Sequence, residues 1–188
     1  MGGILHVCTA NQCRSPMAAC MMQARLAHRY GRRADSVLIA SAGIEARPSA
    51  PILPQALAEL ERRGVKADGF TATPLNPAAV AGAHLVLTAT RRQRDLVVAM
   101  VPDALHRTFT WRELAWLLKG LRPGDVPGAY LVHRMANVAS VAVARRGYRR
   151  PPAPESFDVE DPVGGPNSGY RRAAAEIDAA IATIVEVL

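Results

Sequence analysis

Short apolar runs alternate with segments of helical spacing along most of the chain. The first run, residues 4–8, is followed directly by a helical pattern that continues to Tyr30. Short, mainly apolar runs of this kind are typical of buried strands, and the run Leu-Val-Leu at residues 85–87 is the clearest example. The pattern predicts strands at residues 4–8, 37–40, 84–89 and 107–110.

Capping residues and helix breakers set the expected limits of the helices. Ser15 is a favourable N-cap with Pro16 in the first turn, and Gly31 is expected to end that helix. Asn76 and Thr90 are expected N-caps further along the chain. The expected helices cover residues 16–30, 54–63, 77–81, 91–100, 111–119, 129–145 and 167–188. Because strands and helices alternate, we predict an α/β fold with a four-stranded parallel sheet and helices on both faces.

The composition is that of an ordinary globular protein. The chain has 188 residues, of which 49% are hydrophobic and 21% charged, so we expect one domain over residues 1–188. The net charge of +7 favours an anionic substrate or a solvated basic surface. No nucleic-acid-binding motif accompanies this charge, so no nucleic-acid partner is expected. No apolar run reaches the roughly 18 residues of a membrane span, so no membrane partner is expected.

The three cysteines, Cys8, Cys13 and Cys20, lie within one short segment. An odd number so placed does not form a disulfide framework, and a reducing cytoplasm is the expected location. Cys8 and Cys13 lack the spacing and the nearby His partners of a metal site, so we expect no metal and no cofactor. Cys20 is expected to pack as a small hydrophobic side chain.

The chemistry is expected where the first strand meets the first helix. Open α/β sheets bind ligands at the carboxyl ends of their strands, which is where Cys8 lies. A loop before a helix N-terminus has free backbone N–H groups and a positive dipole, so it attracts an anion. Positive potential also favours the thiolate, which is the nucleophilic form of cysteine. Arg14, after five intervening residues, can hold two phosphate oxygens at once. These residue types suit attack by sulfur on a bound phosphoryl group.

Residues 7–16, Val-Cys-Thr-Ala-Asn-Gln-Cys-Arg-Ser-Pro, resemble the C-x5-R-S signature that low-molecular-weight protein-tyrosine phosphatases carry at the N-terminus. The resemblance implies a flavodoxin-like phosphotyrosine phosphatase I fold, with a phosphocysteine intermediate on Cys8 and phosphate binding by Arg14. It gives residues 41–43, Ser-Ala-Gly, the role of supporting the loop. The other phosphate-binding residues would be Thr9, Ala10, Asn11, Gln12, Cys13 and Ser15.

Several loop residues have more specific expected roles. Ser15 can donate a hydrogen bond to the Cys8 thiolate, and Asn11 tolerates left-handed backbone and can tie the loop together. For Cys13, the resemblance suggests a protective disulfide with Cys8 under oxidation, and the alternative is a buried thiol with no redox role. His6 is expected to be a strand residue and not a base.

A phosphatase of this kind also needs an acid, because the leaving group must take up a proton. The chemistry alone does not choose among Glu155, Asp158, Glu160 and Asp161, which lie in one acidic segment. Asp161-Pro162 matches the Asp-Pro pair that the family carries just before its final helix. The resemblance therefore makes Asp161 the general acid, and then the general base when water cleaves the phosphocysteine.

Two positions depart from the family pattern. Ala10 stands where the family usually has Gly. An alanine fits at this position only if its φ is negative or the backbone strain there is small. Residues 163–165, Val-Gly-Gly, stand where the family often has aromatic residues that flank a phosphotyrosine ring. Phe157 or Tyr170 could take the place of that aromatic wall. Protein phosphotyrosine is the expected substrate, and the second departure concerns this specificity and not the phosphatase chemistry.

Two other functions fit the same loop. An arsenate reductase would bind arsenate in place of phosphate; the thioredoxin-coupled type needs two further cysteines, and none follows Cys20, which leaves a type that uses a small external thiol. A non-catalytic phosphate-binding module would bind without turnover. The expected partners of a phosphatase are a phosphorylated protein, for example the substrate of a cognate tyrosine kinase, or a small aryl phosphate. Residues 121–154 form a longer segment than the family needs, and they could be a specificity element or a variable surface insertion.

Overall fold

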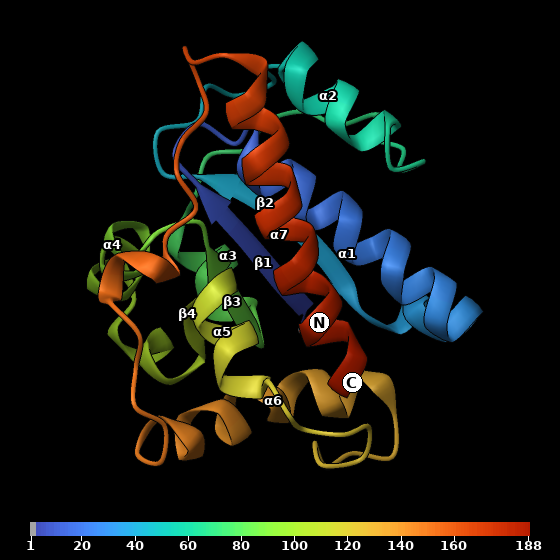
Figure 1. Ribbon diagram of the computed structural model, residues 1–188, viewed down its shortest axis with the longest axis vertical. Coiled ribbons are helices and arrows are strands. Elements are labelled where there is room, and N and C mark those ends of the chain that lie inside the picture. The colour runs from blue at the N-terminus through green and yellow to red at the C-terminus, as the bar shows by residue number, and fades with distance from the viewer. Residues whose placement is uncertain (1–2) are drawn as a thin grey trace.

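The computed structural model describes residues 3–188 and confirms a parallel four-stranded sheet, with the strand order β2-β1-β3-β4. The strands are β1 (Gly3–Cys8), β2 (Leu38–Gly43), β3 (Leu85–Thr88) and β4 (Thr108–Thr110). β1 lies in the middle of the sheet (Figure 1), where Val7 is opposite Ala42 on one side and Thr88 on the other. Cys8 therefore ends a central strand, as predicted.

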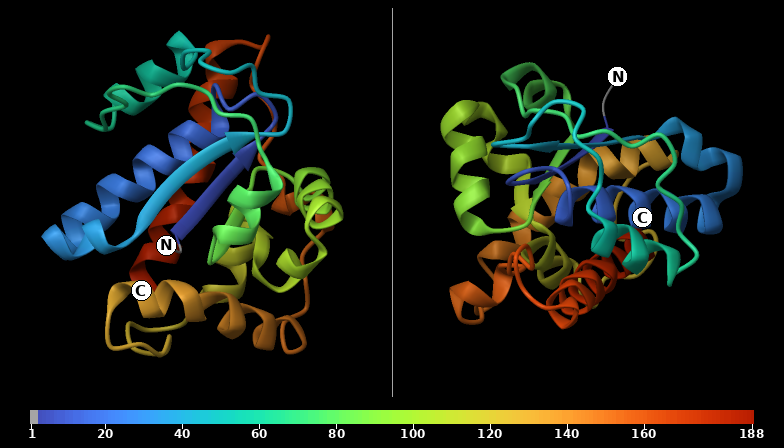
Figure 2. Two further views of the ribbon diagram at one scale, coloured as in Figure 1. Left: turned by 180° about the vertical axis from the view of Figure 1, so that it is seen from behind. Right: turned by 90° about the horizontal axis from the view of Figure 1, so that it is seen from above.

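Helices cover both faces of the sheet, also as predicted. One face carries α1 (Arg14–Tyr30), α2 (Pro54–Glu61), α5 (Trp111–Leu118), α6 (Leu131–Arg146) and α7 (Asn167–Val187). The other carries α3 (Pro77–Gly82) and α4 (Arg91–Met100), and the view from above in Figure 2 shows α3 and α7 on opposite sides. Side chains of β1 contribute to a hydrophobic core on each face of the sheet. Ile4 packs in the core beneath α1 and α7, and Leu5 and Val7 pack in the core beneath α3 and α4. Three 3-10 helices complete the chain: η1 (Gly31–Ser36), η2 (Pro102–Arg107) and η3 (Pro154–Phe157).

The expected caps of α3 and α4 are confirmed, and α5 also begins with a side-chain cap. The Asn76 side chain accepts a backbone hydrogen bond at the start of α3. Thr90 with Gln93 forms a capping box at the start of α4, and Thr110 with Glu113 forms a second one at the start of α5. These local bonds satisfy backbone N–H groups that have no partner inside their helix.

Two expected boundaries were wrong. α1 begins at Arg14, and its N-cap is Cys13, so Ser15 lies inside the first turn and does not cap the helix. Its hydroxyl instead lies beside the thiol of Cys8. β2 continues to Gly43, so residues 41–43 belong to the strand, which was expected to end at residue 40. Both differences come from contacts between the loop and β2, which local sequence rules do not include.

Residues 121–154 contain α6, whose buried residues Leu131, Met135 and Val138 belong to the main core. The helix contacts β1, η1 and η2, and it lies at the bottom of Figure 1, at the end of the sheet opposite to Cys8. The buried face makes α6 part of the main core. A specificity element and a variable insertion both stay predictions for residues 121–154.

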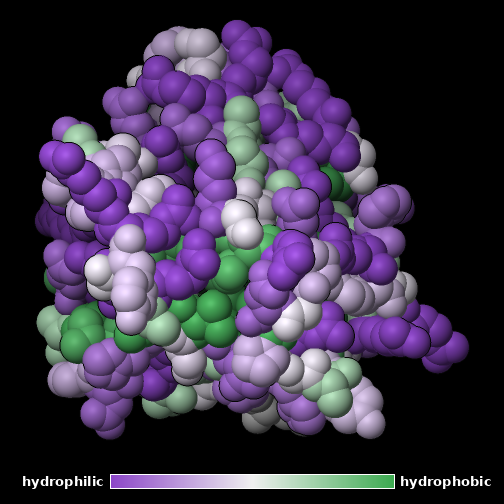
Figure 3. Space-filling model, turned by 60° about the horizontal axis from the view of Figure 1, so that its bottom comes forward, coloured by the Kyte–Doolittle hydropathy of each residue, from purple (hydrophilic) through white to green (hydrophobic). Residues whose placement is uncertain are grey.

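The lower face of the molecule is mostly hydrophilic, with apolar residues gathered near its centre (Figure 3). A hollow of about 550 Å³ lies between α5 and α7, and Trp116, Leu118 and Ala180 are among the residues that line it. Within residues 3–188, no helix combines the length and the apolar character needed to cross a membrane.

Candidate active site

Residues 9–13 form a loop between β1 and α1, which we call the phosphate loop. Among residues 3–188, no protein acceptor takes a hydrogen bond from the backbone N–H groups of this loop. Carbonyls in and beside the loop do have partners: the Ile44 N–H donates to Cys8 O (3.0 Å), the Glu45 N–H donates to Thr9 O (2.8 Å), and the Leu53 N–H donates to Gln12 O (2.9 Å). The loop is therefore held through its carbonyls, which leaves its donors available for an anion.

Asn11 holds the loop in shape, as predicted. It is fully buried, and its φ of 53° places it in the left-handed region. Its Nδ2 donates to Ser15 Oγ at 2.8 Å and to Ser41 Oγ at 2.9 Å, while its Oδ1 accepts from the Thr73 N–H at 2.8 Å. One side chain thus joins the loop to α1, to β2 and to the segment before α3.

Gly43 allows β2 to pass close under the loop. A Cβ at this position would lie 2.6 Å from Thr9 O and 2.7 Å from Asn11 N, which is closer than real contacts allow. Ala10, in contrast, is not among the non-glycine residues of the described chain that have positive φ, which are Asn11 and Ser49. Alanine therefore fits the loop without the backbone strain that a left-handed conformation would bring.

The Cys8 thiol lies at the base of the loop and is buried, with 3% of the residue exposed. Its Sγ is 3.0 Å from Ser15 Oγ. Because Asn11 donates to the same hydroxyl, the Ser15 proton is directed either to this sulfur or to the carbonyl of Ala42, which is 3.3 Å away. The geometry suits the predicted donation from Ser15 to a Cys8 thiolate.

Cys13 is a free thiol of different character. Burial, together with the nearby charges of Cys8 and Asp161 and against a smaller opposite effect of Arg14, raises its pKa to about 12. Cys13 therefore stays protonated at neutral pH and does not compete with Cys8 as a nucleophile. The disulfide between the two cysteines stays a prediction.

Arg14 connects the phosphate loop with the predicted acid. The residue is 3% exposed, and its Nη1 donates to the carbonyl of Val159 at 3.0 Å. Its Nη2 lies 3.4 Å from Thr9 Oγ1 and forms an ion pair with the carboxylate of Asp161. Residues 14 and 161, which are far apart in the sequence, meet at one point of the fold.

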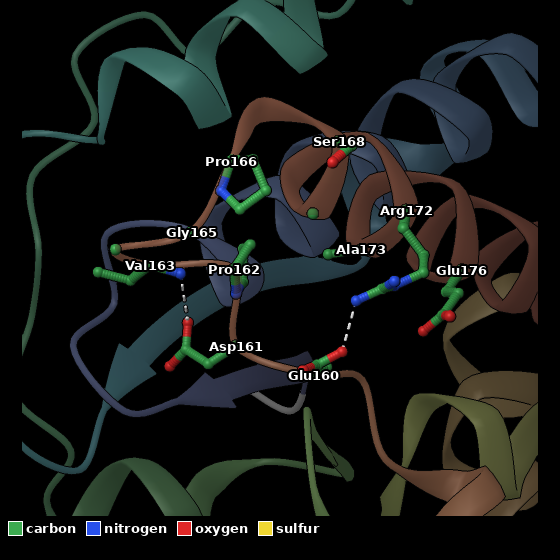
Figure 4. Close-up of a pocket in the computed structure, with 12 residues that line it drawn as sticks. Glu160, Asp161, Pro162, Val163, Gly165, Pro166, Ser168, Arg172, Ala173 and Glu176 are labelled. Carbon is green, nitrogen blue, oxygen red and sulfur yellow. Dashed lines mark hydrogen bonds and ion pairs between the residues drawn. The ribbon is translucent and has the colours of Figure 1, made fainter.

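The structure separates the acidic residues that chemistry alone did not distinguish. Asp158 accepts from the Arg91 backbone N–H at 2.7 Å and pairs with the guanidinium of the same residue. Glu160 pairs with Arg172, and Figure 4 shows its carboxylate pointing away from that of Asp161. Of the carboxylates in this segment, Asp161 is the one that reaches Arg14.

Residues 160–165 border the phosphate loop on the side of Asp161, and we call this segment the lip. It has no aromatic ring at residues 163–165, and the side chain of Val163 is exposed there. Phe157 packs against Trp116, with ring centroids 5.5 Å apart, and does not supply the missing wall. Tyr170 is buried, and burial together with the charges of Cys13 and Asp161 raises its pKa. A pocket of about 360 Å³ opens between this lip and α7 (Figure 4).

One site residue was not foreseen from the sequence. Gln93, the second partner of the capping box of α4, also donates through Nε2 to Thr9 Oγ1 at 3.0 Å. The spacing of Thr90 and Gln93 indicates the cap, but nothing in it indicates the contact with the phosphate loop.

A family comparison agrees with this arrangement. The model of a family described as "Low molecular weight phosphotyrosine protein phosphatase" matches residues 3–118. The chain belongs to this family. The match includes the phosphate loop and ends with α5, so Asp161 lies outside it.

Named relatives of the chain include two kinds of phosphatase. A protein-arginine-phosphatase of Geobacillus stearothermophilus is 26% identical over 185 residues, covering 98% of this chain and 95% of the relative. A protein-arginine-phosphatase of Bacillus subtilis is 31% identical over 110 residues, covering 58% of this chain and 70% of the relative. The solved low molecular weight protein tyrosine phosphatase of T. tengcongensis is 25% identical with a TM-score of 0.68, and all of both chains is covered. The chain is thus a phosphatase of this family, and its relatives differ in the phosphorylated residue that their names give.

Proposed function

We propose that this protein is a cysteine-dependent protein phosphatase that works through a phosphocysteine on Cys8. The observation that carries the proposal is the meeting of Arg14 with both the phosphate loop and Asp161. In the first step the Cys8 thiolate attacks phosphorus. The S–P bond forms, the bond from phosphorus to the leaving group breaks, and Asp161 donates a proton to the leaving atom.

The second step returns the enzyme to its starting state. Asp161 takes a proton from water, the water oxygen attacks phosphorus, and the S–P bond breaks to give inorganic phosphate and the Cys8 thiolate. Ser15, 3.0 Å from the sulfur, stabilises the departing thiolate by a hydrogen bond. The loop N–H groups and Arg14 hold the equatorial oxygens through both steps.

Asp161 has to change partners during this cycle. In the ligand-free protein its carboxylate pairs with Arg14, at the position where a phosphate would bind. A phosphate dianion on Arg14 displaces the carboxylate, which is half-exposed and next to the leaving-group side of the loop. Binding of the substrate thus frees the Asp161 carboxylate from the guanidinium, and the carboxylate takes up a proton from solvent before it acts as the acid.

Phosphotyrosine on a protein is the first candidate substrate, as the sequence predicts. A second class, protein phosphoarginine, is favoured by the composition of the lip. The lip offers no ring to stack on a tyrosine, but Glu160 and Asp161 expose carboxylates there that could attract a guanidinium. The arginine phosphatase of G. stearothermophilus, similar over nearly the whole chain, supports the same candidate. A cytoplasmic location, where Cys8 stays reduced, fits both classes.

The experiment compares one peptide sequence in two forms, with phosphotyrosine or with phosphoarginine at the same position. The wild-type protein is assayed with dithiothreitol and a chelator, and a small aryl phosphate serves as a reference. We expect turnover of the aryl phosphate and of at least one peptide, and the ratio of the two kcat/KM values identifies the class. Bound phosphate without any turnover would overturn the proposal in favour of a binding module. Arsenate reduction with an added small thiol, in place of hydrolysis, would overturn it in favour of the reductase.

A further inference from the structure

Gln93 contacts the active site from a helix that lies outside the phosphate loop. The residue is 5% exposed, and both ends of its amide are occupied. Its Oε1 accepts from the N–H groups of Ala89 and Thr90, each at 3.1 Å, and its Nε2 donates to Thr9 Oγ1 at 3.0 Å. A single side chain therefore joins the start of α4 to the residue that follows Cys8.

The bonds of Gln93 belong to a closed ring. Thr9 Oγ1 also lies 3.4 Å from Arg14 Nη2, and Arg14 Nη1 donates to Val159 O at 3.0 Å. The Val159 N–H donates to the carbonyl of Ala89 at 2.8 Å. The Ala89 N–H donates to Gln93 Oε1, and this bond closes the ring. The ring passes through the phosphate loop, the guanidinium, the segment that carries Asp161, and the end of β3.

We propose that Gln93 is a positioning residue, which fixes the Arg14 guanidinium and sets the segment around Asp161 against the phosphate loop. The inference rests on the proposed function, because Gln93 acts through Arg14 and Asp161. The planar guanidinium of arginine forms two parallel hydrogen bonds with phosphate only in the correct orientation. A displacement of about 1 Å in such a group can lower the rate of reaction roughly 100-fold.

The second capping box of the protein shows what capping alone requires. At the start of α5 the corresponding position is Glu113, which caps through its carboxylate and pairs with Arg94 and Arg146. A carboxylate can accept the capping bonds but cannot donate. An amide at position 93 both accepts from the backbone and donates to Thr9, so the choice of Gln over Glu has a reason beyond the cap.

Two substitutions separate the cap from the ring. Gln93→Glu keeps an acceptor for the N–H groups at the start of α4 but removes the donor to Thr9. Thr9→Val removes the shared acceptor with no change of charge, and Thr9→Ser restores it. Thr90→Ala is the matched control, because it weakens the same cap and leaves the ring intact. Each variant is tested for kcat/KM on an aryl phosphate, for the inhibition constant of inorganic phosphate, and for Tm.

We expect Gln93→Glu and Thr9→Val each to lower kcat/KM roughly 10- to 100-fold and to weaken inhibition by phosphate. Tm should change little in Thr9→Val and should fall in Gln93→Glu, which buries a carboxylate. Thr9→Ser should recover most of the activity. Thr90→Ala should lower Tm and leave kcat/KM as in the wild type. Because both substitutions remove the hydrogen bond between Gln93 and Thr9, the double variant Thr9→Val with Gln93→Glu should lose no more activity than its less active parent.

The proposal is overturned if Gln93→Glu and Thr9→Val keep wild-type kcat/KM and phosphate inhibition. It is also overturned if the loss follows Tm through the whole set, including Thr90→Ala. Failure of the proposed function gives a different result, in which the wild type itself does not turn over. Direct titration of phosphate into the wild type and the variants by calorimetry then still tests the ring, and equal affinities would overturn it.

Discussion

The two ends of the sheet use the same kind of residue in opposite ways. At the end that carries Cys8, one buried arginine, Arg14, is held by a carbonyl and a hydroxyl and still reaches a partner that can be exchanged. At the far end, Arg134 donates to the carbonyls of Gly128 and Leu188, and Arg145 donates to those of Leu117 and Lys119. The far-end arginines close the ends of helices, where positive charge is favourable.

The backbone of the two ends differs in the same sense. Among the described residues, no protein group accepts a hydrogen bond from the N–H groups of the phosphate loop, whereas the carbonyls at the end of α5 accept hydrogen bonds from Arg145 and Arg149. α6 adds an apolar face at the far end, with Met135 and Ala142 fully buried. Changes at the first end should therefore alter activity, and changes at the second should alter stability.

The largest expected effect is that of Cys8→Ser. Loss of the nucleophile should lower kcat on the order of 10⁴-fold or more, because no other step can replace the S–P bond. Binding of inorganic phosphate should persist, since the loop N–H groups and Arg14 are unchanged. Calorimetry with phosphate and a turnover assay check both parts. Residual turnover near the wild-type level would show that Cys8 is not the nucleophile.

Asp161→Asn should have the next largest effect. The amide cannot supply a proton, so kcat on a phosphorylated peptide should fall roughly 10²- to 10³-fold. The loss should be smaller for an aryl phosphate with an acidic phenol, which leaves without a proton. Glu155→Gln is the matched control, because Glu155 is an exposed residue of the same acidic segment that does not pair with Arg14, and its kcat should stay within a few-fold of the wild type. Equal losses for the two variants would contradict the assignment.

Met135→Ala tests the far end. It removes a fully buried side chain of α6, which should lower the free energy of unfolding by roughly 2–5 kcal/mol. Below the unfolding temperature kcat/KM should not change. Tyr148→Ala, at a residue that is 91% exposed, should change the free energy of unfolding by less than about 0.5 kcal/mol. A loss of kcat/KM in folded Met135→Ala would show that the two ends are coupled.

The smallest expected effect concerns His6, which lies in β1 between the two ends. Burial lowers its pKa to about 3, and its neutral ring accepts a hydrogen bond from Trp111 Nε1 at 2.9 Å. The unfolded chain takes up this proton near pH 6.5, and the folded chain does not until about pH 3. Stability is therefore complete above pH 6.5 and falls as the pH is lowered through this window, by about 2 kcal/mol at pH 5.

His6→Gln should remove this part of the pH dependence. The difference in unfolding free energy between the variant and the wild type, measured with urea from pH 7.5 to pH 4, isolates it from the carboxylates. A difference that is independent of pH would contradict the role of His6.

Much of the fold could be predicted because local signals and tertiary structure agree. The buried run at residues 85–87 lies in β3, and the caps at Asn76 and Thr90 lie where short-range rules place them. The predicted start of α1 was wrong. Ser15 is a good N-cap by local rules, but its hydroxyl is bonded to Asn11 and Cys8 instead. Tertiary contacts overrode the local preference there.

The site was predictable only as far as its signature. The resemblance placed Cys8 and Arg14 in one loop and named Asp161 from a short Asp-Pro pair, and the fold brings Asp161 to Arg14. The contact of Gln93 with Thr9 spans 84 positions and has no periodic or spacing signal. Such contacts depend on how α4 packs against β3 and β4, which a single sequence does not show.

The left-handed Asn11, tied to three segments, has a thermodynamic consequence. The ordering entropy of the phosphate loop is lost when the protein folds and not when a ligand arrives. Anion binding should then show little entropic opposition from the loop, and much of its favourable enthalpy should come from the fixed N–H donors. A loop so prepared accepts a tetrahedral anion whatever is attached to it, so selection among substrates falls to the lip, residues 160–165, and to its carboxylates.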